Sequence, residues 1–428
     1  MALADSRPRA LWLVPVPDIG GVARHVLDVA RAGLPGWELH VLCPAGELAR
    51  RLRAQGAHVE TGEFGTEFGL LRSARTLERA IRRLRPDVVH SHLAFADVVS
   101  AVVVGLRQAM GRLPGASGAP LLVTTEHGIA PEDSLYQSSP VRAKAMNIVH
   151  SSRLRITDRT IAVCESTKCV METKWHARDV RVVHNGVDVD AVEKAVRRHR
   201  EKHESSEGTR FLSLSRLAPE KHIDTVIRAF AAVHEVDPEV TLVVGGEGPL
   251  KADLEALASE LELGEAVTFP GFVEPYQALA QADVLVQISE WENYSYTLLD
   301  AVAAGVPVVT NDVGGNQEIV GGDTLASPVS TDDLAERMRG YYPVSGSTPG
   351  SVARSLPNLN AMTDSITKLY SRSDSMRGTI ALFAAVGMNA ALLPYTATTR
   401  GSRRAKELLL CPRSRIDRRF GVGEVGPQ

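Results

Sequence analysis

Cysteine is scarce in this chain and shows no informative spacing. The 428 residues include four cysteines, Cys43, Cys164, Cys169 and Cys411, which have neither zinc-ligand spacing nor the pattern of a disulfide framework. This excludes a zinc-finger domain and a small disulfide-stapled secreted domain, and it favours reduced thiols in the cytosol. The opening residues, MALADSRPRALWLVPVPD, hold too short an apolar run for a secretory signal, so we expect a cytoplasmic protein.

Several sequence signatures are also missing. The glycines of VVGGEGPL (243–250) lack the third-glycine spacing of a dinucleotide fingerprint and Pro249 interrupts the pattern, which excludes NAD binding. Without a G-x-S-x-G motif, an α/β-hydrolase is not expected. Basic residues do not alternate with aromatic ones, and no Asp/Glu/His spacing resembles a metal site. We therefore expect no nucleic-acid partner, no metal ion and no cofactor.

What the chain does contain is a globular composition, 44% hydrophobic and 23% charged, with a length that favours two domains. The net charge of −3 hides an asymmetry. Residues 1–200 carry 28 Lys/Arg against 21 Asp/Glu, whereas the rest of the chain carries 20 against 30. A basic first half could meet anionic lipid or phosphate. A solvated surface excess of basic residues explains the same numbers.

Short apolar runs alternate with helical stretches in both halves, which is typical of parallel sheets covered by helices. The strands expected in the first half are ALWLVPV (10–16), ELHVLCP, DVVHSHL, LLVTTEHG, RTIAVCES and VRVVHNG. Those expected in the second half are RFLSLSRL, VTLVVGGEGPL, AVTFPGFV, DVLVQIS and GVPVVTND. The pattern predicts two doubly wound α/β domains in tandem. Ligands of such domains bind beyond the carboxyl ends of the strands.

We expect an N-terminal Rossmann-like domain over residues 1–195 and a C-terminal Rossmann-like domain over 205–340. The charged stretch 191–209 is the expected hinge. Residues 341–370 combine a Ser/Pro/Gly-rich linker with a helical pattern, AMTDSITKLY, near their end. Residues 371–428 form an atypical basic tail.

The tail contains an uncharged stretch, GTIALFAAVGMNAALLPYTATT (378–399), which is long enough to cross a bilayer. Its Ala, Gly, Thr, Asn and Pro residues make it weakly hydrophobic. A buried or disordered tail is therefore favoured over a membrane helix, and association with a membrane surface is a further alternative.

The stretch ISEWENYSYTLLDAVAAGVPVVTND places Glu292 in a loop after a strand and Asp300 one turn inside the next helix. The two carboxylates would bracket a helix N-terminus, where free N–H groups favour a phosphate. Carboxylates on either side of a diphosphate could bind the hydroxyls of a sugar and of a ribose. An alternative needs no ligand, because Thr297 and Asp300 also fit the T-x-x-D pattern of a capping box.

Other candidates follow strands at the same edges. Arg216 and Lys221 in SRLAPEK could neutralise a diphosphate, although exposed basic pairs are often only solvated. Gly20 and Gly21 in PDIGGVARHV would let backbone N–H groups approach an anion, although a plain tight turn explains them equally well.

Histidines provide the last candidates. His90 and His92 in VVHSH and His127 in TTEHG lie at strand ends that face the expected cleft. A lone histidine more often serves packing or hydrogen bonding than catalysis.

Taken together, these motifs resemble the retaining glycosyltransferases of family 4, which have the GT-B fold of two Rossmann-like domains facing across a cleft. The likeness runs from about residue 10 to 340, and it is densest in LSRLAPEKHIDTVIRAF, VVGGEGPLKADLEALA, VTFPGFV and ISEWENYSYTLLDAVAAGVPVVTNDVGGNQEIV. After residue 340 the chain departs from the family's usual ending, a final helix that crosses back onto the first domain. AMTDSITKLY is the candidate for that helix.

The resemblance implies roles for individual residues. Glu292 would contact the transferred sugar, and Asp300 would bind the ribose at a position where the family usually has the longer Glu. Arg216 and Lys221 would bind the donor diphosphate, faced by the glycine loop of the first domain. The resemblance further implies these roles: His92 in catalysis, Val273 in contact with the base through its backbone, and His127 as an acceptor-side candidate. We place Gly20, Gly21, Tyr296 and Thr297 in the same donor-binding set.

The implied activity is metal-independent, retaining transfer of a sugar from a UDP- or GDP-sugar to a saccharide or lipid-linked acceptor of cell-envelope or exopolysaccharide type. The alternatives are a nucleotide-sugar epimerase of the same architecture and a non-catalytic nucleotide-sugar-binding protein. Basic residues in LLRSARTLERAIRRLRPD (70–87) could dock the protein on the inner face of the cell membrane, although a solvated helix face is favoured.

Overall fold

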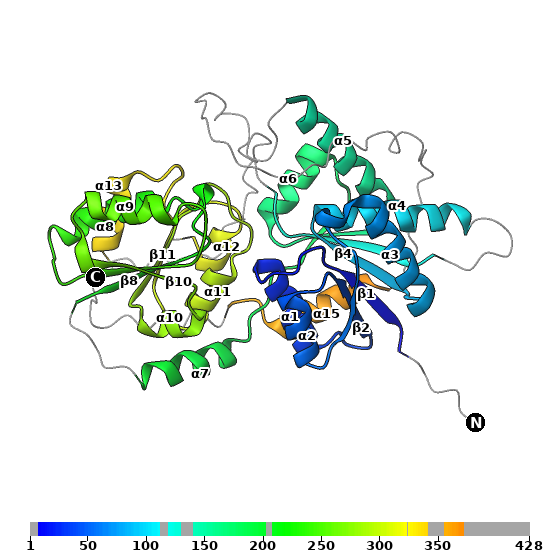
Figure 1. Cartoon of the computed structure of the whole chain (residues 1–428), viewed down its shortest axis with the longest axis horizontal. Coiled ribbons are helices and arrows are strands. Elements are labelled where there is room, and N and C mark those ends of the chain that lie inside the picture. Colours follow the sequence, from blue (N-terminus) through cyan, green and yellow to red (C-terminus); the bar gives the residue numbers. More distant parts are fainter. Residues whose placement is uncertain are drawn as a thin grey trace, which may run out of the picture. The chain divides into compact units, whose positions relative to one another are not determined.

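The computed structural model describes residues 7–111, 119–129, 140–202, 208–322, 324–340 and 355–371. Within them lie two all-parallel sheets, which belong to one compact unit of the chain (Figure 1). The predicted α/β class is thereby confirmed. We refer to the first sheet with its helices as the N-terminal lobe and to the second as the C-terminal lobe.

The sheet of the N-terminal lobe has seven strands. In order across the sheet they are β3 (His58–Thr61), β2 (Glu38–Cys43), β1 (Arg9–Leu13), β4 (Val88–His92), β5 (Leu121–Glu126), β6 (Arg159–Ala162) and β7 (Val180–Val182). The order reverses between β1 and β4, and such a switch point opens a crevice at the carboxyl ends of the strands. The helix after β1 and the last residue of β4, His92, border this crevice.

Helices cover both faces of this sheet, because alternate residues of β1 enter different cores. Ala10 and Trp12 pack in one cluster, whereas Leu11 and Leu13 pack in another. The helices are α1 (Gly21–Ala32), α2 (Glu47–Ala54), α3 (Gly69–Leu84), α4 (Ala94–Met110), α5 (Pro140–Ile156) and α6 (Glu165–Trp175), with a 3-10 turn η1 (Thr66–Phe68).

The sheet of the C-terminal lobe has five strands. In order they are β10 (Val267–Gly271), β9 (Thr241–Gly245), β8 (Arg210–Leu214), β11 (Val284–Gln287) and β12 (Val308–Thr310). Its helices are α8 (Ile223–His234), α9 (Lys251–Glu260), α10 (Pro275–Gln281), α11 (Tyr296–Ala303), α12 (Asn316–Val320) and α13 (Thr331–Arg339), with 3-10 turns η3 (Pro219–Lys221) and η4 (Gly264–Ala266). The alternation recurs here, since Val284 and Val286 face one core and Leu285 faces the other.

Two helices lie outside this scheme. The stretch 191–209, where the hinge was expected, begins within α7 (Val189–Arg200). Val192 and Val196 of α7 are buried in a core cluster shared with Leu279 and Leu298 of the C-terminal lobe. The mostly charged helix α7 thus has a narrow apolar stripe, and this stripe packs against the C-terminal lobe.

The last described helix, α15 (Leu359–Leu369), packs into the N-terminal lobe. Its Met362 and Ile366 join the core that contains Trp12. The segment that was expected to form a crossing helix is therefore helical and packs against the first sheet.

Other expectations have mixed outcomes. Strand β3 was not expected, because HVET lacks an apolar run, and none of its four residues is buried. Cys43 and Cys164 are buried free thiols, as expected, but Cys169 is disulfide-bonded, so the expectation is wrong for that residue. None of the described helices has both the length and the apolar character needed to cross a bilayer. Apart from Ser371, the predicted tail 371–428 lies outside the described residues.

Candidate active site

The N-terminus of α1 follows β1 at its carboxyl end. Gly20 is the N-cap, Gly21 is the first helical residue, and no side chain caps the free N–H groups there. A Cβ on either glycine would meet no atom within 4 Å, and neither residue has a positive φ. Packing and backbone geometry therefore do not require glycine at these positions, which argues against the plain tight turn. Close approach of an anionic ligand to the bare N–H groups would require it.

Strands β4 and β5 end beside the two predicted site histidines. His92 closes β4 and His127 follows β5, and a hydrogen bond of 2.8 Å joins His92 Nδ1 to His127 Nε2. Both rings are buried, and burial lowers the pKa of each well below the usual value for histidine. The two rings are therefore neutral at physiological pH. They can exchange hydrogen bonds with a substrate hydroxyl without adding charge.

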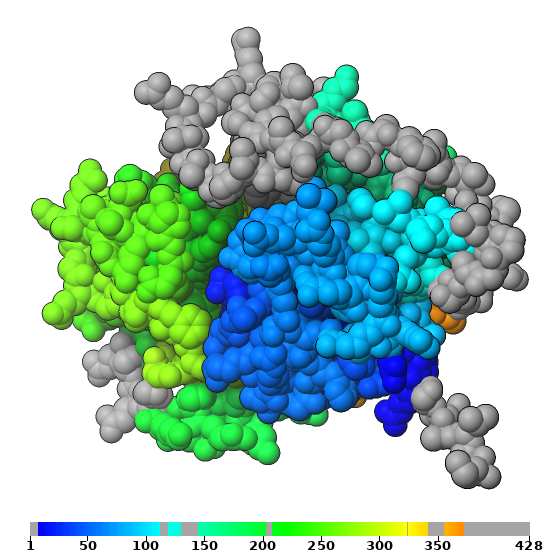
Figure 2. All heavy atoms as spheres, turned by 45° about the vertical axis from the view of Figure 1, so that its right-hand side comes forward, coloured from blue at the N-terminus to red at the C-terminus, as the bar shows by residue number. Residues whose placement is uncertain are grey.

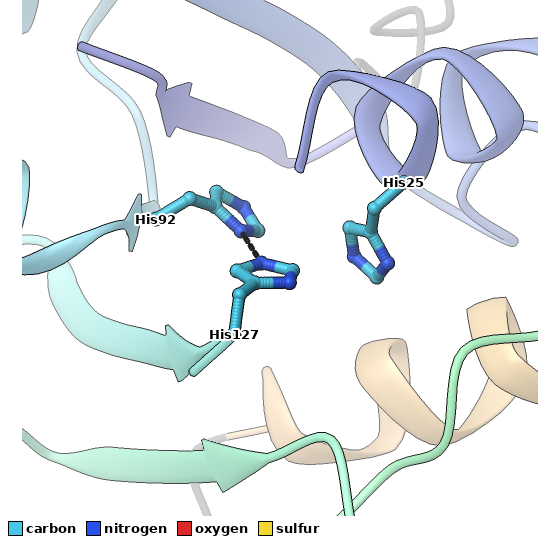
Figure 3. A group of neighbouring side chains, drawn as sticks. All are labelled: His25, His92 and His127. Carbon is cyan, nitrogen blue, oxygen red and sulfur yellow. Dashed lines mark hydrogen bonds between the residues drawn. The ribbon is translucent and has the colours of Figure 1, made fainter. Parts of the chain in front are cut away.

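A third ring, His25 on α1, completes this group, as Figure 3 shows. Its ring centroid lies 4.8 Å from that of His127 and 5.6 Å from that of His92. Its Nδ1 lies 3.2 Å from Asn185 Oδ1 and 3.3 Å from the hydroxyl of Tyr296. Burial lowers the pKa of His25 to about 4. We refer to His25, His92 and His127 as the histidine cluster.

His90, another candidate, has a structural environment. Tyr370 Oη accepts a hydrogen bond of 2.8 Å from Trp12 Nε1, so its own proton is free to go to His90 Nδ1, 2.7 Å away. The other ring nitrogen of His90 then donates to Thr125 Oγ1 at 2.7 Å. Both nitrogens are satisfied inside the core, and His90 ties α15 to the sheet.

A buried ion cluster supports the strand that carries His127. Arg153 on α5 lies 2.6 Å from Glu126, the residue before His127, and 3.0 Å from Asp97 on α4. Burial raises the pKa of Glu126 to about 7, while Arg153 opposes the shift. Breaking such a buried pair would leave an uncompensated charge, so the cluster fixes the position of the strand end. The sequence analysis missed it because the three residues are far apart in the chain.

At the C-terminal lobe, the predicted Lys221 and Glu292 form an ion pair. Lys221 ends η3 after β8, and its Nζ lies 2.5 Å from Glu292 Oε2 in the loop after β11. Gln287 Nε2 donates a further hydrogen bond to Glu292 at 3.3 Å. Both charged side chains are mostly buried, with exposed fractions of 18% and 13%. One ammonium and one carboxylate are thus held together at the carboxyl edge of this sheet.

The predicted Arg216 lies on the same loop and pairs with Glu220 rather than with Glu292. Its side chain is 66% exposed, so the guanidinium is accessible to a ligand. An exposed ion pair of this kind contributes little to stability, and a phosphate could replace its partner.

Asp300 does not cap its helix. The N-cap of α11 is Ser295, whose hydroxyl accepts from Leu298 N, and Thr297 lies inside the helix. The capping-box alternative is therefore wrong. Instead, Asp300 accepts two hydrogen bonds from Arg24 of α1, at 3.1 and 3.2 Å. Burial raises the pKa of Asp300 to about 6, against the opposing effect of Arg24.

The aromatic residues around Arg24 include the predicted Tyr296. The guanidinium of Arg24 lies 5.3 Å from the Tyr296 ring and donates a 3.0 Å hydrogen bond to the Tyr276 hydroxyl. Tyr296 also contacts His25, so this tyrosine touches both the histidine cluster and the Arg24–Asp300 pair. Arg24, His25 and Tyr276 are not among the predicted site residues, although the first two lie three and four positions after Gly21.

Val273 follows β10 and packs against the same core cluster as Tyr296. It lines a cavity of about 570 Å³ together with Phe272 and Gln277. Neither Lys221 nor Glu292 borders that cavity. The structure thus brings together Lys221 with Glu292, His92 with His127, and Tyr296 with His25, and it places Val273 at the cavity beside β10.

Comparison with known proteins supports an enzymatic role. Residues 19–191 match the family described as Glycosyltransferase Family 4, and residues 196–341 match that described as Glycosyl transferases group 1. A glycogen synthase of Mycobacterium tuberculosis is 26% identical over 353 residues, which cover 75% of this chain and 81% of that protein. A phosphatidylinositol N-acetylglucosaminyltransferase component of Arabidopsis thaliana is 27% identical over 325 residues, which cover 74% of this chain and 65% of that protein.

Solved structures agree on the fold. The crystal structure of Anabaena HepE in complex with UDP and glucose has a TM-score of 0.67 at 19% identity and covers 84% of this chain and 98% of its own. This confirms the predicted two-domain, Rossmann-like GT-B architecture. The two family matches fall on the two lobes in turn, and the chain belongs to glycosyltransferase family 4.

Proposed function

We propose that the protein is a retaining, metal-independent glycosyltransferase that moves a sugar from a nucleotide-diphosphate sugar to a saccharide or lipid-linked acceptor. The observation that carries the proposal is the Lys221–Glu292 pair, 2.5 Å apart and mostly buried at the carboxyl edge of the second sheet. A buried lysine beside a carboxylate that also contacts Gln287 supplies both a charge for phosphate and an acceptor for sugar hydroxyls.

Fixed positive groups would stabilise the leaving diphosphate. Lys221 and the accessible guanidinium of Arg216 lie on one loop, so both can reach the same pyrophosphate. The uncapped N-terminus of α1 adds unpaired N–H groups. Such preorganised groups stabilise charge as it develops during departure of the nucleotide, and they perform the task for which other enzymes use a cation.

Retention follows from attack on the face from which the diphosphate leaves. In this scheme the acceptor hydroxyl forms the new glycosidic bond while the old bond to phosphate breaks, and the leaving phosphate takes the hydroxyl proton. The neutral ring of His92 would hydrogen-bond a sugar hydroxyl and orient it, with His127 fixing the His92 ring. Glu292 would hold the donor sugar by its hydroxyls and would not need to act as a nucleophile.

Asp300 is the proposed ribose ligand. Its two oxygens already accept from Arg24, so ribose hydroxyls would use the remaining lone pairs. Tyr296 and Thr297 would line the same site from α11. Among possible donors a UDP-sugar is the first to test, since HepE was crystallised with UDP and glucose. A GDP-sugar is the second, since a relative in Mycobacterium tuberculosis is described as a GDP-mannose-dependent mannosyltransferase.

The acceptor and its location are proposed from the N-terminal lobe. Helix α3 exposes Arg72, Arg75, Arg79, Arg82 and Arg83, and Figure 2 shows α3 and α4, blue to cyan, as a continuous face. Such a face would favour peripheral contact with anionic lipid at the inner side of the cell membrane, near a lipid-linked acceptor. Ion pairs of Arg72 with Glu63 and of Arg82 with Glu78 reduce the free charge, so we expect this contact to be weak.

The test measures sugar transfer from a panel of labelled UDP- and GDP-sugars to saccharide and lipid-linked acceptors. The reactions contain a metal chelator. We expect transfer with the anomeric configuration of the donor retained and with full activity in chelator. Inverted product, or activity that requires an added divalent ion, would overturn the proposal. A donor epimerised without an acceptor would support the epimerase alternative, and binding without any turnover would support a non-catalytic protein.

A further inference from the structure

The histidine cluster has a property that sugar transfer does not use. Its three residues come from three separate elements: His25 from α1, His92 from the end of β4 and His127 from just after β5. Figure 3 shows the three rings close together, and one ring nitrogen of His25 faces the rings of His92 and His127. One nitrogen from each ring lies within 4.8 Å of the others. All three side chains are at most 8% exposed.

Two of the ring nitrogens lack a partner. Asn185 Nδ2 donates to the Tyr294 carbonyl, so Asn185 turns its oxygen to His25 Nδ1, and that nitrogen must carry the proton. His25 Nε2 is then left with a bare lone pair, buried and without a hydrogen-bond partner among the described residues. His92 Nε2 is also buried, and it too has no hydrogen-bond partner among the residues that the structure describes. Buried polar atoms of this kind normally have a partner, so these two point to a ligand.

We propose that His25, His92 and His127 form a binding site for one transition-metal ion of the zinc class. Imidazole nitrogens without a carboxylate suit Zn²⁺, Ni²⁺ or Cu²⁺, whereas Mg²⁺ and Mn²⁺ prefer oxygen. Three protein ligands leave the fourth position of a tetrahedral ion open to water or to a substrate hydroxyl.

Ion binding requires a small local rearrangement. Zn–N bonds are about 2.0–2.1 Å long, which keeps ligand nitrogens within about 4.2 Å of one another. The rings must therefore rotate closer, and the His92–His127 hydrogen bond must be exchanged for metal–nitrogen bonds. Asn185, bonded to His25 Nδ1, would hold the tautomer in which Nε2 binds the ion.

The site uses other groups than the proposed diphosphate site. The diphosphate would bind Lys221 and Arg216 on the C-terminal lobe and the N–H groups at the N-terminus of α1, whereas the ion would bind three imidazoles, of which His25 lies one turn further along α1. The ion would bind His92, the residue proposed for catalysis, and His127, the acceptor-side candidate, together with His25. The inference stands on the cluster alone and does not require the proposed function to be right.

The test measures Zn²⁺ binding to the tag-free full chain by calorimetry, and Co²⁺ binding by its visible absorption. We expect one ion per chain, a tetrahedral cobalt spectrum and no competition from excess Mg²⁺. His25→Gln and His127→Gln should each weaken Zn²⁺ binding at least tenfold. The matched control is His40→Gln, because His40 lies beside Glu38 and His58 in a second imidazole group on β2 and β3, and it should bind as the wild type does.

Three results would overturn the proposal: no saturable one-to-one binding, equal affinity in the wild type and His25→Gln, or an equal loss in His40→Gln. If a variant fails to fold, X-ray absorption spectroscopy of the zinc-loaded wild type still tests the proposal, because it reports which atoms bind the ion. Three nitrogen ligands from imidazole would support the site, and an all-oxygen shell would refute it.

Discussion

The carboxyl edges of the two sheets differ in charge. In the C-terminal lobe this edge carries paired ions, Lys221 with Glu292 and Arg216 with Glu220. In the N-terminal lobe it carries the histidine cluster, whose rings burial keeps neutral, while the ions at the same edge, Glu126 and Arg153, are paired inside the core. The charged edge suits a diphosphate, whereas the neutral edge suits hydroxyl groups that must be oriented without being ionised. Under the proposed function, this difference would divide the chemistry between a donor side and an acceptor side.

The largest effect is expected when charge is removed from the carboxyl edge of the C-terminal sheet. Lys221→Ala and Glu292→Gln should each lower kcat for sugar transfer by about 10²–10³, the usual cost of losing a preorganised group that stabilises developing charge. Steady-state kinetics, with circular dichroism to confirm folding, provides the measurement. Lys251→Ala, which removes a lysine 3.7 Å from Glu247, is the control and should retain activity. Wild-type rates in either site variant would remove that residue from the site.

A smaller effect is expected at the neutral edge. His127→Gln removes the ring that contacts His92 Nδ1, so the His92 ring loses its orientation and kcat should fall by about 10- to 100-fold. The control is His58→Gln, whose ring is 63% exposed on β3. An unchanged kcat for His127→Gln would mean that the two histidines serve packing only.

The ionisation of Asp300 predicts that donor KM depends on pH. Its pKa is raised to about 6, so the carboxyl is ionised above that pH and protonated below it. Protonation removes the anion that Arg24 and the ribose would bind, and donor KM at pH 5 should therefore exceed that at pH 7 by about tenfold. The measurement is donor KM against pH at saturating acceptor. In Asp300→Asn this rise should disappear; its persistence would assign the titration to another group.

The smallest effect is expected for Asp300→Glu. The added methylene extends the carboxylate by about 1.5 Å, toward the reach that the family usually has. Because the Arg24 side chain is 24% exposed, it can move to keep the ion pair, and donor affinity should stay within about threefold or improve. Nucleotide binding by calorimetry tests this. A tenfold loss of affinity would show that Asp300 serves the Arg24 pair alone.

The sequence predicts those features that depend on local patterns. Buried runs such as VVHSH and DVLVQIS gave the strands, and the strands placed His92 and Glu292 at sheet edges. The Lys221–Glu292 pair is consistent with this placement, because the two residues lie in the loops that follow β8 and β11, which are neighbours in one sheet. The family resemblance added roles that spacing alone leaves open.

Features that depend on side chains from distant elements could not be predicted. Ser295 caps α11 without a Glu or Gln three residues later, whereas T-x-x-D at 297–300 offered a false capping pattern. The Arg24–Asp300 pair and the histidine cluster join residues up to 276 positions apart, which no local spacing reveals. Strand β3 lacks buried side chains and pairs with β2 at the edge of the sheet, a contact that its own sequence does not reveal.

Helix α15 has a consequence for synthesis of the protein. Tyr370 completes the core around Trp12, 358 residues earlier in the chain. When the ribosome has made the whole first sheet, its core still lacks Leu359, Met362 and Ile366, and the indole N–H of Trp12 has no phenol to bind. The first lobe to be translated is therefore among the last to be finished. Nascent chains shorter than about 370 residues should expose an unfinished apolar surface that chaperones can bind.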